Sequence, residues 1–282
     1  MTKYTKKAIA FVDVLGFKGM VEKSEQDEIQ LKRLIEITQK LSKGNERENF
    51  ERYGPLCCPK APRIDNHLDY RVTQISDCVI ISSELTPAGL INLINNCWQI
   101  SIRLLQEGIL CRGFISIGNI YHKEHQVIGP GYQKAYASES TVTAFQRATD
   151  ELGTPFIEID DEVVQYILNQ QDLCVKTLFE RLTVADGTKH AIFPFKRLDH
   201  EFGIGGIFGK FESEKHLQAV NNIRDWIADM KFKILENIKD AGPAAENKSQ
   251  HYIAALDKQL VALSKTEEMI YLLQQPAVRR EI

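Results

Sequence analysis

The sequence lacks several features that mark particular classes of protein. Its six cysteines include no CxxC pair, so buried free thiols are the default interpretation, and the adjacent Cys57 and Cys58 make a poor zinc site without a second pair. No apolar run approaches the ~20 residues that a membrane-spanning helix needs. The first seven residues show no signal-peptide cleavage pattern. We therefore expect a cytoplasmic protein with no membrane span.

The chain also lacks an excess of basic residues. Its net charge is −3 and its pI is about 6.2, which argues against a general nucleic-acid binder and leaves room for a small basic pocket that binds a nucleotide. With 43% hydrophobic and 26% charged residues, the composition is that of an ordinary globular protein. A length of 282 residues allows one large domain, or one domain with an accessory segment.

The first informative stretch is residues 8–18, AIAFVDVLGFK. Five apolar residues lead to Asp13 and predict a buried strand, in which a carboxylate is costly unless something pairs with it. Gly16 allows a sharp turn into a helix, whose first N–H groups then point at whatever Asp13 holds. A metal ion with a phosphate fits that arrangement.

A second stretch has the same character. Residues 70–82, YRVTQISDCVIIS, form a β-rich run with Asp77 at its centre. On neighbouring strands, two carboxylates roughly 3–5 Å apart would repel each other unless a divalent cation lay between them. The alternative is that Asp13 and Asp77 are unrelated edge or cap residues. We favour the metal site because both carboxylates occur in such similar contexts.

The spacing of apolar residues predicts alternating strands and helices. Residues 20–41 and 85–107 have helical periodicity, and Pro87 after Thr86 suits the start of the second helix. Residues 42–68 are polar and rich in Gly and Pro, which predicts an irregular excursion able to cover the site. The remaining predictions are a strand at 109–121, a turn at 122–125, a short strand at 127–128, a helix at 132–149, a strand at 154–159, a helix from 160 or 161 to 168, strand-like pieces in 178–198, a glycine-rich break at 202–209, and helices at 211–238 and 248–274.

Four motifs, in chain order, resemble those of the class III nucleotidyl cyclases. Residues 11–17, FVDVLGF, resemble the F-x-D-x-x-G-F metal motif, and Ser76 with Asp77 resembles the second, (S/G)-D, metal motif. Residues 112–118, RGFISIG, resemble the R-x-G-x-x-x-G strand, with the middle glycine displaced. Residues 129–139, GPGYQKAYASE, resemble the G-x-x-V-N-x-A-x-R-x-E helix start. The resemblance covers about residues 8 to 160, and the pattern is most similar to the stand-alone pyrimidine cyclases of bacterial Pycsar antiphage systems.

The resemblance implies a fold and an organisation. The order of elements already predicts a mixed α/β (α+β) layer fold with both key carboxylates on strands. The resemblance adds a cyclase-like, ferredoxin-like palm sheet with helices. We assign residues 1–205 to a catalytic domain, and the helices predicted after the glycine-rich break form a C-terminal helical accessory segment in 206–282. The resemblance also implies a homodimer with shared active sites.

The same resemblance assigns roles to individual residues. It implies that Asp13 and Asp77 bind two Mg²⁺ or Mn²⁺ ions, with the Val14 carbonyl as a further ligand. Arg112 would bind the terminal phosphates; by itself, a surface arginine at the start of a strand explains that residue equally well. The remaining substrate-binding residues that the resemblance implies are Leu15, Gly16 and Phe17, whose amides cradle the phosphates, with Thr73, Gln126 and Gln133.

Departures from the family pattern bear on the substrate. The two positions that read the base in purine cyclases fall on Thr73 and Gln126, which are neutral and suit uracil or cytosine. The helix asparagine of the family becomes Gln133. Its transition-state arginine becomes Ala137, and Arg71, Lys134 and Arg147 are candidate replacements.

Three functions remain open on these grounds. The first is a pyrimidine nucleotidyl cyclase that makes cyclic UMP from UTP, or cyclic CMP from CTP, as a second messenger in antiphage defence. A second is a non-catalytic cyclase-fold sensor that binds a nucleotide, which Ala137 favours and the presence of both Asp13 and Asp77 disfavours. The third is another palm-type polymerase, such as a cyclic-oligonucleotide synthase.

Overall fold

The computed structural model describes residues 3–42, 69–195, 212–239 and 241–274. The chain divides into two compact units, residues 1–194 and 195–282. The domain boundary predicted between residues 205 and 206 lies outside the described residues, as do most of the excursion predicted at 42–68 and the glycine-rich break at 202–209.

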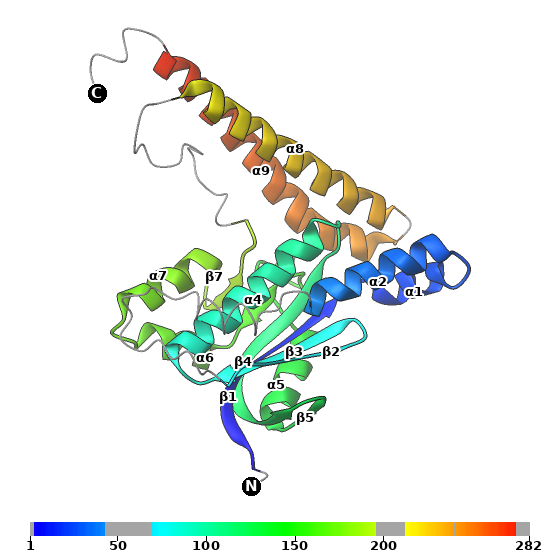
Figure 1. Cartoon of the computed structure of the whole chain (residues 1–282), viewed down its shortest axis with the longest axis vertical. Coiled ribbons are helices and arrows are strands. Elements are labelled where there is room, and N and C mark those ends of the chain that lie inside the picture. The colour runs from blue at the N-terminus through cyan, green and yellow to red at the C-terminus, as the bar shows by residue number, and fades with distance from the viewer. Residues whose placement is uncertain (1–2, 43–68, 196–211, 240, 275–282) are drawn as a thin grey trace. The chain divides into compact units, whose positions relative to one another are not determined.

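Eight strands form one sheet in the described part of the first unit, in the order β2-β3-β1-β4-β6-β8-β7, with β5 paired to β4 (Figure 1). Neighbouring strands are antiparallel except β4 and β6, which are parallel. The strands are β1 (Thr5–Val14), β2 (Arg71–Ile75), β3 (Cys78–Glu84), β4 (Cys111–Lys123), β5 (Gln126–Ile128), β6 (Ile157–Ile159), β7 (Thr183–Asp186) and β8 (Lys189–Ile192).

Helices connect these strands and cover them. The helices described in the first unit are α1 (Phe17–Ser24), α2 (Glu28–Ser42), α4 (Pro87–Leu105), α5 (Pro130–Glu139), α6 (Asp161–Leu168) and α7 (Leu173–Leu182). This is the mixed α/β sheet with helices that the sequence predicts, and that prediction is confirmed.

One face of the sheet carries the main hydrophobic core. Successive side chains of a strand point to opposite faces, so Ala8, Ala10, Val12 and Val14 of β1 share this face, and all are buried. They pack with apolar residues of α2, α4, α6 and α7. We call this the α4 face. The hydroxyl of Thr86 caps α4 by accepting from the Gly89 amide at 3.1 Å, in agreement with the predicted start of that helix.

The opposite face, here called the α5 face, has a smaller core. Ile9 and Phe11 of β1 pack there with Ala135 of α5 and two isoleucines of the neighbouring strands. The helix lies close to the sheet because its second residue is glycine: a Cβ on Gly131 would lie 2.4 Å from Ile9 Cδ1. The ring of Phe11 also meets that of Tyr136 edge-on, at a centroid distance of 5.2 Å.

Several predicted elements differ from the structure. Asp77 does not lie on a strand; it occupies the two-residue turn between β2 and β3, where Ser76 has a φ of 53°. The helix predicted at 20–41 is two helices, α1 and α2. The helix predicted at 132–149 ends at Glu139. Part of the segment predicted as strand-like, 178–198, belongs to α7.

The second unit contains α8 (Ser213–Ile238) and α9 (Pro243–Gln274), close to the two C-terminal helices that the sequence predicts. Along α8, Val220, Ile227, Met230 and Ile234 are buried, at the spacing of one helix face. In the same unit Phe195 meets Tyr252 of α9 at 5.7 Å between ring centroids. No helix in the described ranges has the length and apolar character needed to cross a membrane.

Candidate active site

The two predicted metal carboxylates come together at the end of β1. Asp13 stands opposite Cys78 in the β1–β3 register, and Cys78 directly follows Asp77 in the chain. The Val14 amide donates to the carbonyl of Asp77 at 3.1 Å, so a backbone hydrogen bond joins the two segments directly. Both carboxylate residues are half-buried. The sequence placed both correctly near one another, although only Asp13 lies on a strand.

The electrostatics of Asp13 reflect this crowding. Burial, then the charges of Asp77 and Glu139, raise its pKa from 3.8 to about 6, against the opposing effects of Arg112 and of a hydrogen bond from the Val14 backbone. A carboxylate held this way favours the approach of a cation. Two half-buried carboxylates therefore share a region with too little positive charge to balance them.

Cys78 is a third member of this region that the sequence did not single out. Burial, followed by the charges of Asp13 and Asp77, raises the pKa of its thiol to about 11, and the thiol donates to the Ile75 carbonyl at 3.2 Å. The side chain therefore stays a neutral thiol at physiological pH. It is a small neighbour of the carboxylates and a poor ligand for Mg²⁺ or Mn²⁺, which prefer oxygen donors.

Arg112 stands opposite Asp13 on β4. Its Nε donates to Oε1 of Glu139, the last residue of α5, and both side chains are largely buried. Gly153 makes room for the guanidinium, because a Cβ there would lie 2.2 Å from Nη1 of Arg112. Sequence reasoning assigned Glu139 no role, although it closes the fourth motif; only the tertiary structure shows that this carboxylate holds the arginine.

The turn after β1 has the predicted strand-to-helix form. Gly16 precedes the first residue of α1 with a φ of 77°, a left-handed conformation that glycine adopts without strain. The Leu15 amide donates to the Leu110 carbonyl at 2.9 Å and so anchors the turn to the segment before β4. Gly16 and Phe17 lie at the N-terminus of α1, where helix amides lack intrahelical acceptors and attract anions.

The donor set at this point fits a small divalent cation. Carboxylate and carbonyl oxygens are the ligands that Mg²⁺ and Mn²⁺ prefer, and Asp13, Asp77 and the Val14 backbone supply them. Within the described ranges no group of three or more His, Cys, Asp or Glu side chains is arranged to hold a metal. An ion here would complete its coordination with water or substrate oxygens.

The predicted base reader Thr73 is buried in a hydrogen-bond network. Its hydroxyl donates to the Glu124 carbonyl at 3.0 Å and lies 2.8 Å from Nε2 of His122, whose Nδ1 lies 2.9 Å from the Ser82 hydroxyl. Because the single proton of Thr73 goes to the carbonyl, we assign the Nε2–H tautomer to the imidazole, with Ser82 donating to Nδ1. Burial, then Lys7 and Arg71, lower the pKa of His122 to about 4.

Gln126 and Gln133, the other residues predicted to contact the base or ribose side of the substrate, are exposed. Gln126 begins β5, directly after the β4–β5 turn whose Glu124 carbonyl accepts from Thr73. Gln133 and Ala137 lie on the exposed side of α5. Two of the candidates to replace the family arginine are already paired, Arg71 with Asp69 and Lys134 with Asp160; the third, Arg147, is exposed.

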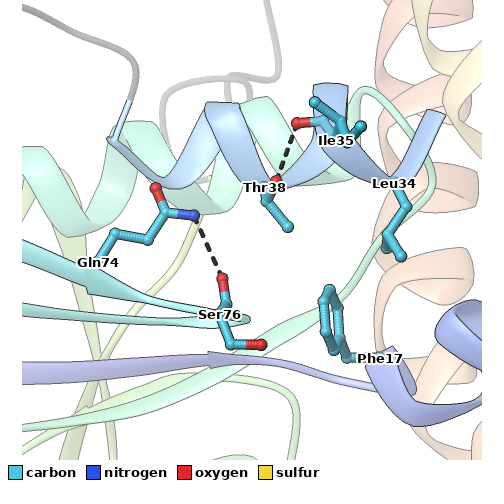
Figure 2. A pocket seen from close by; sticks show the side chains of 6 residues that line it. All are labelled: Phe17, Leu34, Ile35, Thr38, Gln74 and Ser76. Atoms are coloured by element: carbon cyan, nitrogen blue, oxygen red, sulfur yellow. Dashed lines mark hydrogen bonds between the residues drawn. The ribbon is translucent and has the colours of Figure 1, made fainter. Parts of the chain in front are cut away.

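A cavity of about 390 Å³ lies between α2, the first turn of α1 and the β2–β3 hairpin. Figure 2 shows its lining: Gln74 and Ser76 of the β2–β3 hairpin, Leu34, Ile35 and Thr38 of α2, and Phe17 of the first turn of α1. Of these residues, only Phe17 was predicted to belong to the site. Sequence reasoning missed the others because α2 reaches the hairpin only in the folded chain.

Comparison with known proteins gives matches to solved structures alone. No family model matches the sequence, and no curated protein matches it. The chain is similar to the catalytic core of a rhodopsin-guanylyl cyclase with converted specificity in complex with ATPαS, with 16% identity and a TM-score of 0.38 over 68% of this chain and 96% of that one. It is similar to a bacterial light-regulated adenylyl cyclase with 16% identity and a TM-score of 0.36, over 61% of this chain and 48% of that longer one.

Proposed function

We propose that this chain is a nucleotidyl cyclase of the class III type that converts UTP to 3′,5′-cyclic UMP and pyrophosphate. The observation that supports this most is the pairing of Asp13 with Asp77 beside the turn that opens α1. Four motifs in the family order support it independently. The pyrimidine assignment and a role of the product as a messenger in antiphage defence rest on the resemblance to pyrimidine cyclases.

The reaction makes one bond and breaks another. The ribose 3′-oxygen attacks the α-phosphorus, the bond from that phosphorus to the bridging oxygen breaks, pyrophosphate leaves, and the 3′-hydroxyl proton passes to water. Two Mg²⁺ or Mn²⁺ ions, when bound, would lower the pKa of the 3′-hydroxyl and neutralise the phosphates. Asp13, Asp77 and the Val14 carbonyl would hold these ions. The amides of Gly16 and Phe17 would bind phosphate oxygens, with Leu15 fixing the turn.

Arg112 would bind the terminal phosphates. Its Nε is committed to Glu139, which leaves the two Nη groups to donate to oxygens in the fork geometry that suits phosphate. Glu139 then acts as a positioning residue, since it orients the guanidinium beside Asp13. The Glu139 carboxylate also compensates the positive charge of Arg112 when no nucleotide is bound.

We further propose a homodimer whose subunits complete one another's sites, with Gln133 reaching the nucleotide held by the other subunit's aspartates. A mixture of Asp13→Ala and Gln133→Ala chains should then regain part of the activity that each lacks alone. Sedimentation should show a dimer. An active, strictly monomeric protein would contradict this arrangement.

The direct test is incubation of the purified chain with each of the four nucleoside triphosphates and Mn²⁺, with products identified by mass spectrometry. We expect cyclic UMP and pyrophosphate from UTP, much less product from ATP or GTP, and none with the Asp77→Asn variant. Cyclic CMP as the main product would support the cytidylate alternative. Linked nucleotides would support the synthase instead.

The alternative of a non-catalytic nucleotide sensor is favoured by one observation, the alanine at position 137 where the family has its transition-state arginine. Such a sensor would bind UTP or CTP and leave it intact. Measured binding without turnover, in the presence of Mn²⁺, would select this alternative.

A further inference from the structure

Residues 120–128 form a two-stranded ribbon, made of the end of β4 and of β5, that lies on the α5 face. Ile120 and Val127 of this ribbon pack in the small core of that face. Cys78, which stands opposite Asp13 in the neighbouring strand, packs against the same core. The ribbon therefore shares a face of the sheet with the proposed metal site.

Three hydrogen bonds hold this ribbon to β2 and β3. In the tautomer assigned above, Nε2–H of His122 donates to the Thr73 hydroxyl of β2 at 2.8 Å, and the Ser82 hydroxyl of β3 donates to Nδ1 at 2.9 Å. The Thr73 hydroxyl donates to the Glu124 carbonyl, in the turn of the ribbon, at 3.0 Å. We call these four residues the His122 network. It joins three strands that are distant in sequence and fixes the ribbon on the sheet.

The His122 network leaves Thr73 no donor for a ligand. Its only proton goes to the Glu124 carbonyl, and its side chain is buried together with those of Ser82 and His122. Burial lowers the pKa of His122 to about 4, so the imidazole is neutral at physiological pH and keeps one donor and one acceptor. To read a base, the Thr73 hydroxyl would have to leave the network and strand a buried imidazole, which is costly.

What the network holds in place is the turn that leads to Gln126. Glu124 has a φ of 53°, a conformation that residues other than glycine seldom adopt and that costs of order 1 kcal/mol or more. The hydrogen bond from Thr73 fixes the carbonyl of that residue. Gln126 follows two positions later, pairs with Lys123 across the turn and exposes its side chain. Its amide, with a donor and an acceptor, therefore extends from a backbone that the His122 network fixes.

We propose that Thr73 and His122 are positioning residues, which hold the β4–β5 ribbon so that Gln126, and not Thr73, meets the nucleobase. The inference rests on the proposed cyclase function and assigns the residues that determine its base specificity. The ribbon is then a fixed wall of the base site. Without the network the ribbon can move away from the sheet, the Gln126 amide loses its fixed origin, and a larger purine is admitted.

Hydrogen exchange of the full chain tests the network without a nucleotide. Thr73→Val keeps the shape of the side chain and removes the hydroxyl, so amides of the ribbon should exchange about tenfold faster or more, while those of α4 should not change. Thr38→Val is the matched control, because it removes a hydroxyl that donates to the Ile35 carbonyl on α2, and it should leave the ribbon unchanged. Equal ribbon exchange in Thr73→Val and wild type would overturn the inference.

A double-mutant cycle tests whether Thr73 acts through Gln126. Thr73→Val, His122→Phe and Gln126→Ala should each lower the UTP:ATP ratio of kcat/KM about tenfold or more. Adding Thr73→Val to Gln126→Ala should lower the ratio by less than about twofold further, because the residue that it positions is already gone. Thr73→Ser keeps the hydroxyl and should retain nearly the wild-type ratio. His122→Phe is informative because it leaves the Thr73 hydroxyl in place.

The outcomes separate this inference from the proposed function. If Thr73→Val lowers the ratio as much in the Gln126→Ala background as in the wild type, Thr73 reads the base itself and the inference is overturned. An unchanged ratio in His122→Phe or in Gln126→Ala overturns it as well. A wild-type chain that forms no cyclic nucleotide overturns the cyclase function; the ratio of UTP to ATP dissociation constants in the same variants then decides the role of Thr73 by the same criterion.

Discussion

The two faces of the sheet use the same strands for different purposes. On the α4 face, β1 contributes Ala8, Ala10, Val12 and Val14, all apolar and packed under four helices. On the α5 face, the alternate positions of the same strand include Lys7 and Asp13, and among the described residues its small core draws on one helix, α5. We propose that the first face mainly provides stability and that the second carries the proposed site, because burying charge and exposing it to ligands make opposite demands.

Ion pairs on the α5 face show how it tolerates its charges. Lys7 is 2% exposed, and its ammonium lies 2.5 Å from Asp69 Oδ2. Burial raises the pKa of Asp69, but the hydrogen bond and charge of Lys7, with those of Arg71, outweigh it and lower the pKa. Asp13, at the other end of β1, has less compensation, and its pKa is raised instead. The contrast within one strand supports the proposal that Asp13 binds a cation.

The largest expected difference between the faces comes from Asp13→Asn and Val12→Ala, which are adjacent in sequence. Asp13→Asn should lower cyclase activity by at least about a hundredfold, because it removes an anionic metal ligand. Its unfolding free energy at pH 7 should rise by about 1–2 kcal/mol after allowance for partial exposure, since a carboxylate with a raised pKa destabilises the folded chain above that pKa.

Val12→Ala should do the reverse. Removing buried methyl groups from the α4 face should cost about 2 kcal/mol, while activity per folded molecule stays close to that of the wild type. Urea unfolding and a coupled pyrophosphate assay measure both quantities. Comparable activity losses in the two variants, scaled to the folded fraction, would erase the proposed division between the faces.

Breaking the Arg112–Glu139 pair should have the largest effect on stability. Glu139→Ala leaves a mostly buried guanidinium unpaired and should lower the unfolding free energy by about 3 kcal/mol. The double variant Arg112→Met, Glu139→Leu should recover much of that loss, because it removes both charges together. Chemical denaturation of the three proteins tests this, and a single variant as stable as the wild type would show that solvent compensates Arg112.

The His122 network should make stability depend on pH. Its pKa is 6.5 when unfolded and about 4 when folded, so the unfolded chain binds more protons between these values and stability falls as the pH drops through that window. Between about pH 7.5 and 5 the loss should be about 2 kcal/mol. Titration of Asp13 changes the unfolding free energy in the opposite direction between pH 6 and 3.8. The test therefore needs a variant that removes the titration of His122 alone.

The isolating variant is His122→Gln, which keeps a hydrogen-bonding amide and does not titrate. The difference in unfolding free energy between wild type and variant should shrink or reverse in favour of the variant as the pH is lowered. Thermal melts at matched ionic strength measure it. Parallel pH profiles for the two proteins would contradict a neutral, buried imidazole.

The smallest effect should come from the cap of α4. Thr86→Ala removes the acceptor for the Gly89 amide and should cost about 1 kcal/mol. Activity per folded molecule should not change, because this end of the helix lies on the α4 face. Thr86→Ser is the matched control that retains the acceptor, and it should recover nearly all of the loss in a denaturant titration.

Local signals in the sequence predicted the elements that local interactions determine. The strand at residues 8–14, the turn at Gly16, the capped helix α4 and the C-terminal helices follow from apolar spacing and terminus signals. The β2–β3 turn was missed because Ser76 and Asp77 are not the Asn-Gly or Asp-Gly pair of common two-residue hairpins, and apolar residues flank them on both sides. Helix α7 was missed although Val175, Phe179 and Leu182 follow helical spacing, because the helix has only ten residues and runs directly into β7.

The candidate site likewise contains residues that local sequence signals predict and contacts that only the tertiary structure shows. The carboxylates of Asp13 and Asp77 were found from sequence because each stands out in an apolar run. The pairing of Arg112 with Glu139 and the enclosure of Thr73 by His122 join residues 27 and 49 positions apart. Those contacts depend on how α5 and the second half of β4 return over the sheet, which single-sequence patterns do not encode.

The central place of β1 has a consequence for how the chain is made. This strand is synthesised well before its hydrogen-bond partners on β4, from Cys111 to Ile120, which follow roughly a hundred residues later. At about 5–20 residues per second, an apolar segment of high β-propensity stays without its partner for several seconds or more. Until then it is open to pairing with other nascent chains. Yield in a cell should therefore depend on holdase chaperones and on growth temperature more than the stability of the finished sheet suggests.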